Sequence, residues 1–144
     1  MNGVIEDGIA AAMGRAGVPV RTYHQGAVVF VKDDEADCAY VVKTGRVEIR
    51  EKGRVLESIG PGEIFGEVGM IDRGRRSASA VAIEPTEVHM IDREAFDRLV
   101  RGDAEFSLAI MRDLARRLRS MNAHQSPPTG LPLAPGLGGR RSAG

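Results

Sequence analysis

The feature of this chain that most constrains its fold is a series of short apolar segments, each followed by a turn signal, between residues 18 and 91. The turn signals include Gln25-Gly26, Thr44-Gly45, Lys52-Gly53 and Gly60-Pro61-Gly62, and such pairs separate strands. The expected strands span residues 18–23, 27–31, 38–43, 46–50, 55–59, 64–65, 77–83 and 88–91. Many short strands at close spacing predict a mainly β fold, either a sandwich or a jelly-roll barrel.

Helical periodicity flanks this strand-rich segment on both sides. Residues 5–16 are expected to form a short helix that ends before Gly17. Asp92 and Asp103 are each placed to cap a helix, and the first helix would stop at Gly102. One apolar face recurs along the second helix, at Phe106, Ile110, Leu114, Leu118 and Met121. That face would pack either on the strands or on a second copy of the chain, so a homodimer through the last helix is one expected arrangement.

The last part of the chain has a different composition. Four of the seven prolines and five of the glycines lie in SPPTGLPLAPGLGGRRSAG, which cannot build a packed core. The expected organisation is a folded domain over residues 1–122 and a flexible tail over 123–144. Within the domain we expect an N-terminal helical segment (1–17), the strand-rich segment (18–91) and two helices (92–122).

Composition narrows the class of protein. At 144 residues the chain has the length of one domain. No apolar run approaches the ~20 residues that span a bilayer, and the N-terminus carries Glu6 and Asp7 where a signal peptide would be basic. Cys38 is the only cysteine, so an internal disulfide is excluded. The net charge is zero, and seven basic against three acidic residues after residue 100 make a weak nucleic-acid surface. These observations favour a cytoplasmic protein that binds no membrane.

The chemistry of the chain is concentrated in Phe65-Gly66-Glu67-Val68-Gly69 and in Arg76-Ser77-Ala78. Gly66 stands at the expected start of a short helix, where free amides favour an anion and the missing side chain lets a ligand approach the backbone. Arg76 offers a planar fork of donors that suits two phosphate oxygens. Glu67 only accepts hydrogen bonds, so its expected partner is a hydroxyl pair or a neighbouring amide.

The residues that follow the arginine complete the expected site. Ser77 can donate to a phosphate oxygen or to the edge of a base, while Ala78 and Ala80 leave room where the strand passes the ligand. The expected ligand therefore carries a negative charge, a hydroxyl group and an apolar ring. A cyclic nucleoside monophosphate has all three.

These segments closely resemble the phosphate-binding cassette of cyclic-nucleotide-binding domains, and the similarity covers residues 18–122. YVVKTGRVEI (40–49) resembles the strand-turn-strand of the family, LESIGPGEIFGE (56–67) its approach to the cassette, and RSASA (76–80) its phosphate arginine and following strand. The last two helices resemble its hinge and lid helices. The resemblance, to effector domains like that of the catabolite activator protein, implies a double-stranded β-helix (a jelly-roll β-roll) with flanking helices.

The same resemblance implies roles for individual residues. Glu67 would bind the ribose 2′-hydroxyl, and Arg76 would bind the cyclic phosphate together with the amides of Gly66 and Val68. The whole implied site comprises Gly66, Glu67, Val68, Arg76, Ser77 and Ala78 in the cassette, Ile49, Leu56 and Ile59 around base and sugar, and Arg117, Met121 or Asn122 as a lid over the base. The ligand would be cyclic AMP in preference to cyclic GMP, with a cyclic dinucleotide less favoured. The module would signal by movement of its last helix to an unknown protein partner, without catalysing a reaction.

The chain departs from the family pattern in two places. Asp33-Asp34 stands where the family usually has glycine before an acidic residue, although aspartate tolerates the left-handed turn conformation better than most residues. Bacterial transcription regulators with this fold carry a helix-turn-helix domain after the lid helix, whereas here a proline- and glycine-rich segment follows. We therefore expect no DNA binding by that route.

Two other functions stay open as alternatives. An interaction module would keep the roll with a vestigial pocket and bind another protein through its helical face. A metal-dependent enzyme of the cupin type would need clustered histidines, but His24, His89 and His124 fall on different elements, so no metal is expected. Cys38 is expected to be a buried strand residue, and the acidic loop 33–37 a solvated one.

Overall fold

The computed structural model describes residues 8–125, with side chains for residues 8–122. Its contacts divide the chain into two compact units, residues 1–110 and 111–144. The expected helical start at residues 5–7 and most of the expected tail, residues 126–144, lie outside the described residues. The helix α5 (Ala104–Gln125) continues three residues past the predicted domain boundary at 122.

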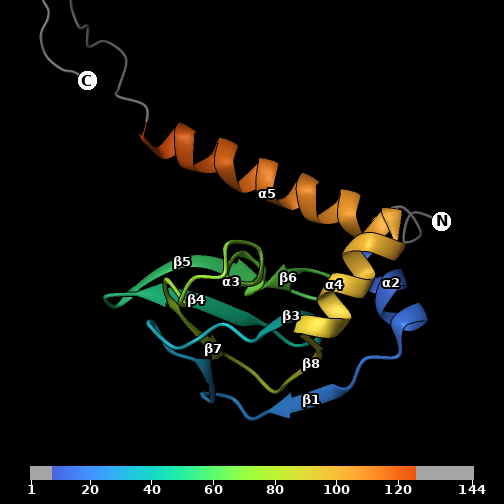
Figure 1. Cartoon of the computed structure of the whole chain (residues 1–144). Coiled ribbons are helices and arrows are strands. Elements are labelled where there is room, and N and C mark those ends of the chain that lie inside the picture. Colours follow the sequence, from blue (N-terminus) through green and yellow to red (C-terminus); the bar gives the residue numbers. More distant parts are fainter. Residues whose placement is uncertain (1–7, 126–144) are drawn as a thin grey trace, which may run out of the picture. The chain divides into compact units, whose positions relative to one another are not determined.

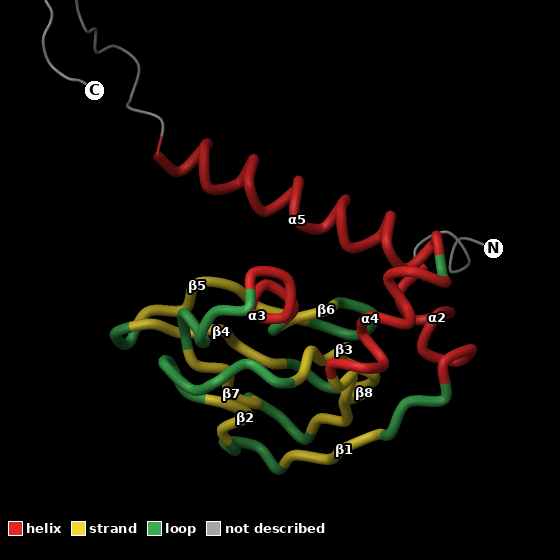
Figure 2. Tube along the Cα trace, in the orientation of Figure 1, coloured by secondary structure: helices red, strands yellow, loops and turns green. Residues whose placement is uncertain are grey.

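The strands form two four-stranded antiparallel sheets, which confirms the predicted mainly β fold. One sheet has the order β1-β8-β3-β6 and the other the order β2-β7-β4-β5, so neighbours in space are mostly distant in sequence. Figure 2 shows the strands as short segments joined by turns and loops. Their bounds are β1 Val20–Tyr23, β2 Val28–Phe30, β3 Cys38–Thr44, β4 Val47–Glu51, β5 Arg54–Ile59, β6 Ile64–Phe65, β7 Ser79–Ala82 and β8 Thr86–Asp92.

The predicted turns contain residues with positive φ, most of them glycines. Lys52 and Gly53 have φ values of 53° and 77°, and two successive positive values are those of the two-residue turn that suits a hairpin such as β4–β5. Gly45, between β3 and β4, has φ 94°. Only glycine adopts such angles without a steric penalty, so the turn residues determine where each strand ends.

The interior of the roll is apolar and draws on both sheets. Its buried cluster comprises Tyr40, Val42, Val47, Ile59, Phe65, Ala80 and Val88. Alternate residues of β3, namely Ala39 and Val41, are also fully buried, although they point to the other face of their sheet. That face contacts the helices α2 (Gly8–Ala16) and α4 (Arg93–Gly102), which group together in Figure 1. Strand β3 is therefore buried on both faces.

The two predicted helix caps are present. The Asp92 carboxylate accepts a hydrogen bond from the amide of Ala95 at 2.9 Å and caps α4. The Asp103 carboxylate accepts one from the amide of Phe106 at 3.1 Å, at the start of α5. Asp103 also forms an ion pair with Arg15 of α2 at 2.9 Å. The N-terminal helix is thus tied to the junction between the two C-terminal helices.

Candidate functional site

A short helix, α3 (Glu67–Asp72), begins where β6 ends, and Gly66 makes the turn between them with φ 78°. The side chain of Glu67 is fully buried, whereas Val68, one residue further, is 46% exposed. A Cβ atom at position 66 would lie 2.9 Å from Nη1 of Arg76. The glycine is therefore required both by the backbone angle and by the close approach of the guanidinium.

Arg76 is buried, with 5% of its surface exposed. Its Nη1 donates to the carbonyl of Gly66 at 2.8 Å, and its Nη2 donates to the carbonyl of Cys38 at 2.5 Å. Burial lowers the pKa of the Arg76 guanidinium, while Tyr40 and other neighbours act in the opposite direction. An arginine side chain nevertheless stays charged in proteins. Because both of these acceptors are neutral, the site holds a buried positive charge at the start of α3.

One nitrogen of this guanidinium has a distinct environment. Within residues 8–125, Nε of Arg76 is buried and has no hydrogen-bond partner. A guanidinium has five N–H donors, and two are used by the carbonyls of Gly66 and Cys38. The remaining donors suit an anion with several acceptor oxygens, and a cyclic phosphate is such an anion.

The backbone of Arg76 is fixed by the acidic loop. Its carbonyl accepts from the amide of Asp33 at 2.8 Å, and its amide donates to the carbonyl of Asp34 at 2.9 Å. Asp33 has φ 77°, so this aspartate adopts the left-handed conformation expected for a position where the family places glycine. The loop, rather than a strand, therefore sets the position of the arginine.

The strand after Arg76 is shorter at both ends than the predicted one. The predicted strand 77–83 is wrong at its start, because Ser77 and Ala78 form a bend and β7 begins at Ser79. Just before this bend, the backbone of Arg76 forms hydrogen bonds with the loop at Asp34 instead of pairing with a strand. Ser77 is exposed and Ala78 is 5% exposed.

The three residues predicted around base and sugar have different environments. Ile59 is buried in the core, and Ile49 is partly buried and pairs with Ala80 across β4 and β7. Leu56 is 52% exposed, next to the register shift that separates the Ile49–Glu57 pair from the Arg50–Val55 pair. Ile49 and Ile59 therefore share the roll interior, while Leu56 lies at its surface.

The predicted lid residues Arg117, Met121 and Asn122 belong to the second unit. There Arg117 forms an ion pair with Asp113 one turn earlier in α5 at 3.0 Å, and Asp113 is paired with Arg116 as well. Their role as a lid stays a prediction.

Two aromatic residues at this site were missed in the sequence. The guanidinium carbon of Arg76 lies 4.0 Å from the ring centre of Phe30 and 5.9 Å from that of Tyr40. No spacing motif links them, since they lie on β2 and β3. The alternation of β3, which directs Tyr40 into the roll, was the available signal for one of them.

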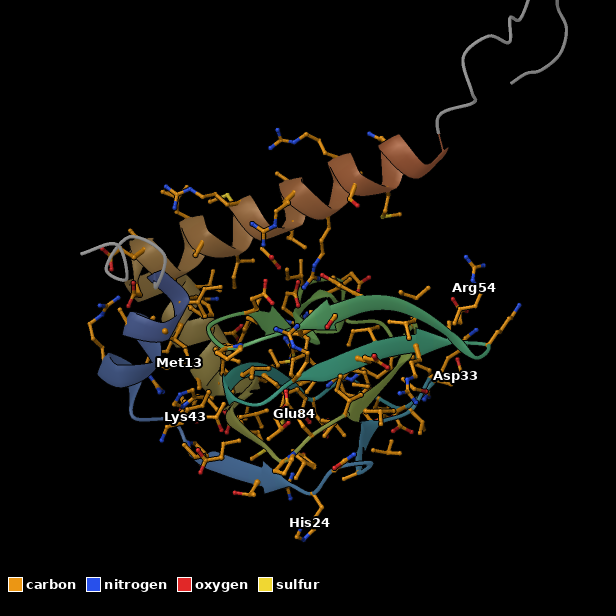
Figure 3. The ribbon with its side chains drawn as sticks, turned by 180° about the vertical axis from the view of Figure 1, so that it is seen from behind. Met13, His24, Asp33, Lys43, Arg54 and Glu84 are labelled. Atoms are coloured by element: carbon orange, nitrogen blue, oxygen red, sulfur yellow. The ribbon has the colours of Figure 1, made fainter. Side chains whose placement is uncertain are left out.

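The residues considered for other chemistry do not assemble a site in the described chain. Among residues 8–125, no group of three or more histidine, cysteine or acidic side chains is placed to hold a metal. His24 is exposed and projects from the roll in Figure 3. Cys38 is partly buried in β3, and burial raises the pKa of its thiol, which opposes a role as a nucleophile.

A surface hollow of about 250 Å³ lies away from the cassette. It is lined by Ala10, Val41, Val42, Lys43, Pro61, Gly62 and His89. Figure 3 shows Lys43 near α2, whose Met13 is also labelled. None of these residues belongs to the predicted cassette, so we place the candidate site at Arg76 and Glu67 on grounds of chemistry.

Comparison with known proteins identifies the family. Residues 20–103 match the family model described as "Cyclic nucleotide-binding domain", so the chain belongs to the cyclic-nucleotide-binding domain family. It is similar to the cyclic AMP receptor protein of Thermus thermophilus, with 39% identity over 104 residues, 69% of this chain and 48% of that protein. It is also similar to a CRP-like cAMP-activated global transcriptional regulator of Mycobacterium tuberculosis, with 32% identity over 82% of this chain and 54% of that protein.

A solved structure agrees with the sequence matches. The catabolite activator protein of Thermus thermophilus superposes with a TM-score of 0.70 and 35% identity, over 81% of this chain and 56% of that one. The predicted β-roll with flanking helices is thereby confirmed. The chain spans about half the length of these relatives.

Proposed function

We propose that this chain is a receptor module, without catalytic activity of its own, that binds a cyclic nucleoside monophosphate at Arg76 and Glu67. The buried guanidinium of Arg76, with an unpartnered Nε among the described residues, supports the proposal most directly. A buried cation that has only neutral carbonyls for hydrogen-bond acceptors gains more from an anionic ligand than an exposed arginine would.

The proposed ligand contacts follow from the chemistry of each residue. The donors of Arg76 that the two carbonyls leave unused would pair with phosphate oxygens, and the amides at the start of α3 add donors to the same phosphate. Glu67 accepts from the ribose 2′-hydroxyl. Arg76 is only 5% exposed, so the phosphate can reach it only if the start of α3 moves.

The proposed output is a movement of the C-terminal helices. Nη1 of Arg93, the first residue of α4, donates to the carbonyl of Met70 in α3 at 3.1 Å. This bond links the helix that carries Glu67 to the predicted hinge helix. A ligand shifts such an equilibrium only through contacts that differ between the two states, and the proposed contacts at α3 would supply that difference.

The base preference and the setting are also proposals. We propose cyclic AMP in preference to cyclic GMP, because the Thermus and Mycobacterium relatives are named for cyclic AMP. We further propose a folded domain over residues 1–122, a cytoplasmic location, an unknown downstream protein, and a homodimer through the last helix. Among residues 8–125, no helix is long and apolar enough to cross a membrane.

A thermal-shift screen tests the receptor function against the interaction module. At a ligand concentration of 100 Kd, cyclic AMP should stabilise the fold by about 2.7 kcal/mol. A melting temperature that responds to neither cyclic AMP nor cyclic GMP would favour the interaction module.

The role of Glu67 makes a separate prediction. Glu67→Gln keeps the shape of the side chain but removes its charge, so the affinity for cyclic AMP should fall about 10- to 100-fold. The 2′-deoxy analogue lacks the hydroxyl, so Glu67→Gln and the wild type should bind this analogue with nearly the same affinity. Calorimetric titration of both ligands measures the difference.

The exposed Glu84, labelled in Figure 3, gives the matched control. Glu84→Gln should bind both ligands as the wild type does. If Glu67→Gln lowers the affinity for cyclic AMP and for its 2′-deoxy analogue by the same factor, Glu67 does not bind the 2′-hydroxyl.

A further inference from the structure

The guanidinium of Arg76 is enclosed by aromatic rings from two strands. Its central carbon lies 4.0 Å from the ring centre of Phe30 on β2 and 5.9 Å from that of Tyr40 on β3. The Phe30 ring lies 6.0 Å from that of Tyr40 and 6.1 Å from that of Phe65, while the last two stack at 5.1 Å. Phe30 is thus fixed by two further rings and faces the cation at contact distance.

The space around this contact is filled. A Cβ atom built on Gly66 would lie 3.4 Å from both the Phe30 and the Tyr40 rings, and 2.9 Å from Nη1 of Arg76. The backbone at the start of α3 therefore packs against the rings and the guanidinium together. A guanidinium confined in this way has few orientations available.

We infer that Phe30, supported by Tyr40, is a positioning residue for Arg76: its ring fixes the plane of the guanidinium so that the free donors are presented to the ligand. The inference rests on the proposed binding of a cyclic phosphate by Arg76. Two carbonyls hold the guanidinium by its terminal nitrogens, but hydrogen bonds to Nη1 and Nη2 alone leave its tilt undetermined. The ring supplies the missing restraint through a desolvated cation–π contact.

The affinity for cyclic AMP should depend on the aromatic face of residue 30 rather than on the volume of its side chain. Phe30→Leu keeps an apolar side chain without a π face, and the affinity for cyclic AMP should fall about 3- to 30-fold. Phe30→Tyr keeps the face and should bind within about twofold of wild type. Phe96→Leu is the matched control, because Phe96 packs edge-on against Phe106 rather than on Arg76. It should lower the affinity much less than Phe30→Leu does.

A spectroscopic measurement separates positioning from simple core packing, and it needs no ligand. The side-chain NMR signals of Arg76, assigned by their loss in Arg76→Lys, should show a ring-current shift in wild type and Phe30→Tyr. The shift should collapse in Phe30→Leu and persist in Phe96→Leu.

Two results would overturn the inference. One is an Arg76 signal that is the same in Phe30→Leu as in wild type, and the other is a shift that collapses while the affinity stays at the wild-type value. If wild type binds no cyclic nucleotide, the proposed function fails. The ring-current shift of Arg76 then still tests whether Phe30 positions the guanidinium.

Discussion

Arg76→Ala should abolish micromolar binding of cyclic nucleotides. The substitution removes the buried guanidinium that we propose pairs with the cyclic phosphate. Losing one partner of a buried charge pair costs about 3–5 kcal/mol, which corresponds to about 10²–10³-fold or more in affinity. Calorimetric titration with cyclic AMP measures the loss directly.

The substitution also has a structural cost that the controls must separate. Without Arg76 the carbonyls of Gly66 and Cys38 lose their donors, which should lower stability by about 1–3 kcal/mol. Circular dichroism should nevertheless show a folded chain. Arg75→Ala is the matched control, because Arg75 is exposed and its Nη1 donates to the backbone carbonyl of Asp33 rather than to the start of α3. If Arg76→Ala binds cyclic AMP with the same affinity as Arg75→Ala, then Arg76 is not part of the binding site.

Gly45→Ala should destabilise the fold by about 2–5 kcal/mol. Gly45 has φ 94°, a conformation that costs an L-residue about 1–2 kcal/mol. A Cβ atom there would also lie only 2.5 Å from the carbonyl oxygen of Pro85 and 2.6 Å from Cα of Thr86. These are backbone atoms, and relieving such overlap costs about 1–3 kcal/mol more. Chemical denaturation of wild type and variant gives the difference in the free energy of unfolding.

Gly53 offers a control that separates strain from overlap. Its φ is 77°, but a Cβ atom there would meet nothing within 4 Å. Gly53→Ala should therefore cost only the conformational part, about 1–2 kcal/mol. If Gly45→Ala and Gly53→Ala lower the free energy of unfolding equally, the overlap of a Cβ atom at position 45 with Thr86 would add no cost, and this prediction would be wrong.

The sequence predicted the strands well because the signals that mark them are local. Lys52-Gly53 requires a tight hairpin, and the turn at Gly45 requires a glycine, so the ends of β3, β4 and β5 could be read from neighbouring residues. Asp92 and Asp103 predicted the two helix starts for the same reason. Where pairing with a distant loop decides, as at Ser77, the predicted boundary was wrong.

The site was predictable only in part. Gly66, Glu67 and Arg76 were identified from their spacing, and the structure brings Arg76 onto the carbonyl next to Glu67. Phe30 and Tyr40 reach the guanidinium through pairings that span the chain, β2 with β7 and β3 with β8. The carbonyl of Cys38 is a backbone group, which every residue type carries, so the sequence could not predict its contact with Arg76.

The measurement that tests the central claim most directly is a calorimetric titration of the chain with cyclic AMP, with Arg76→Ala as the blank. Our account predicts one saturable site per chain with a Kd on the order of 1 µM, equivalent to about −8 kcal/mol, and no saturable heat in the blank. A folded wild-type chain that gives no saturable heat with cyclic AMP or cyclic GMP would contradict it.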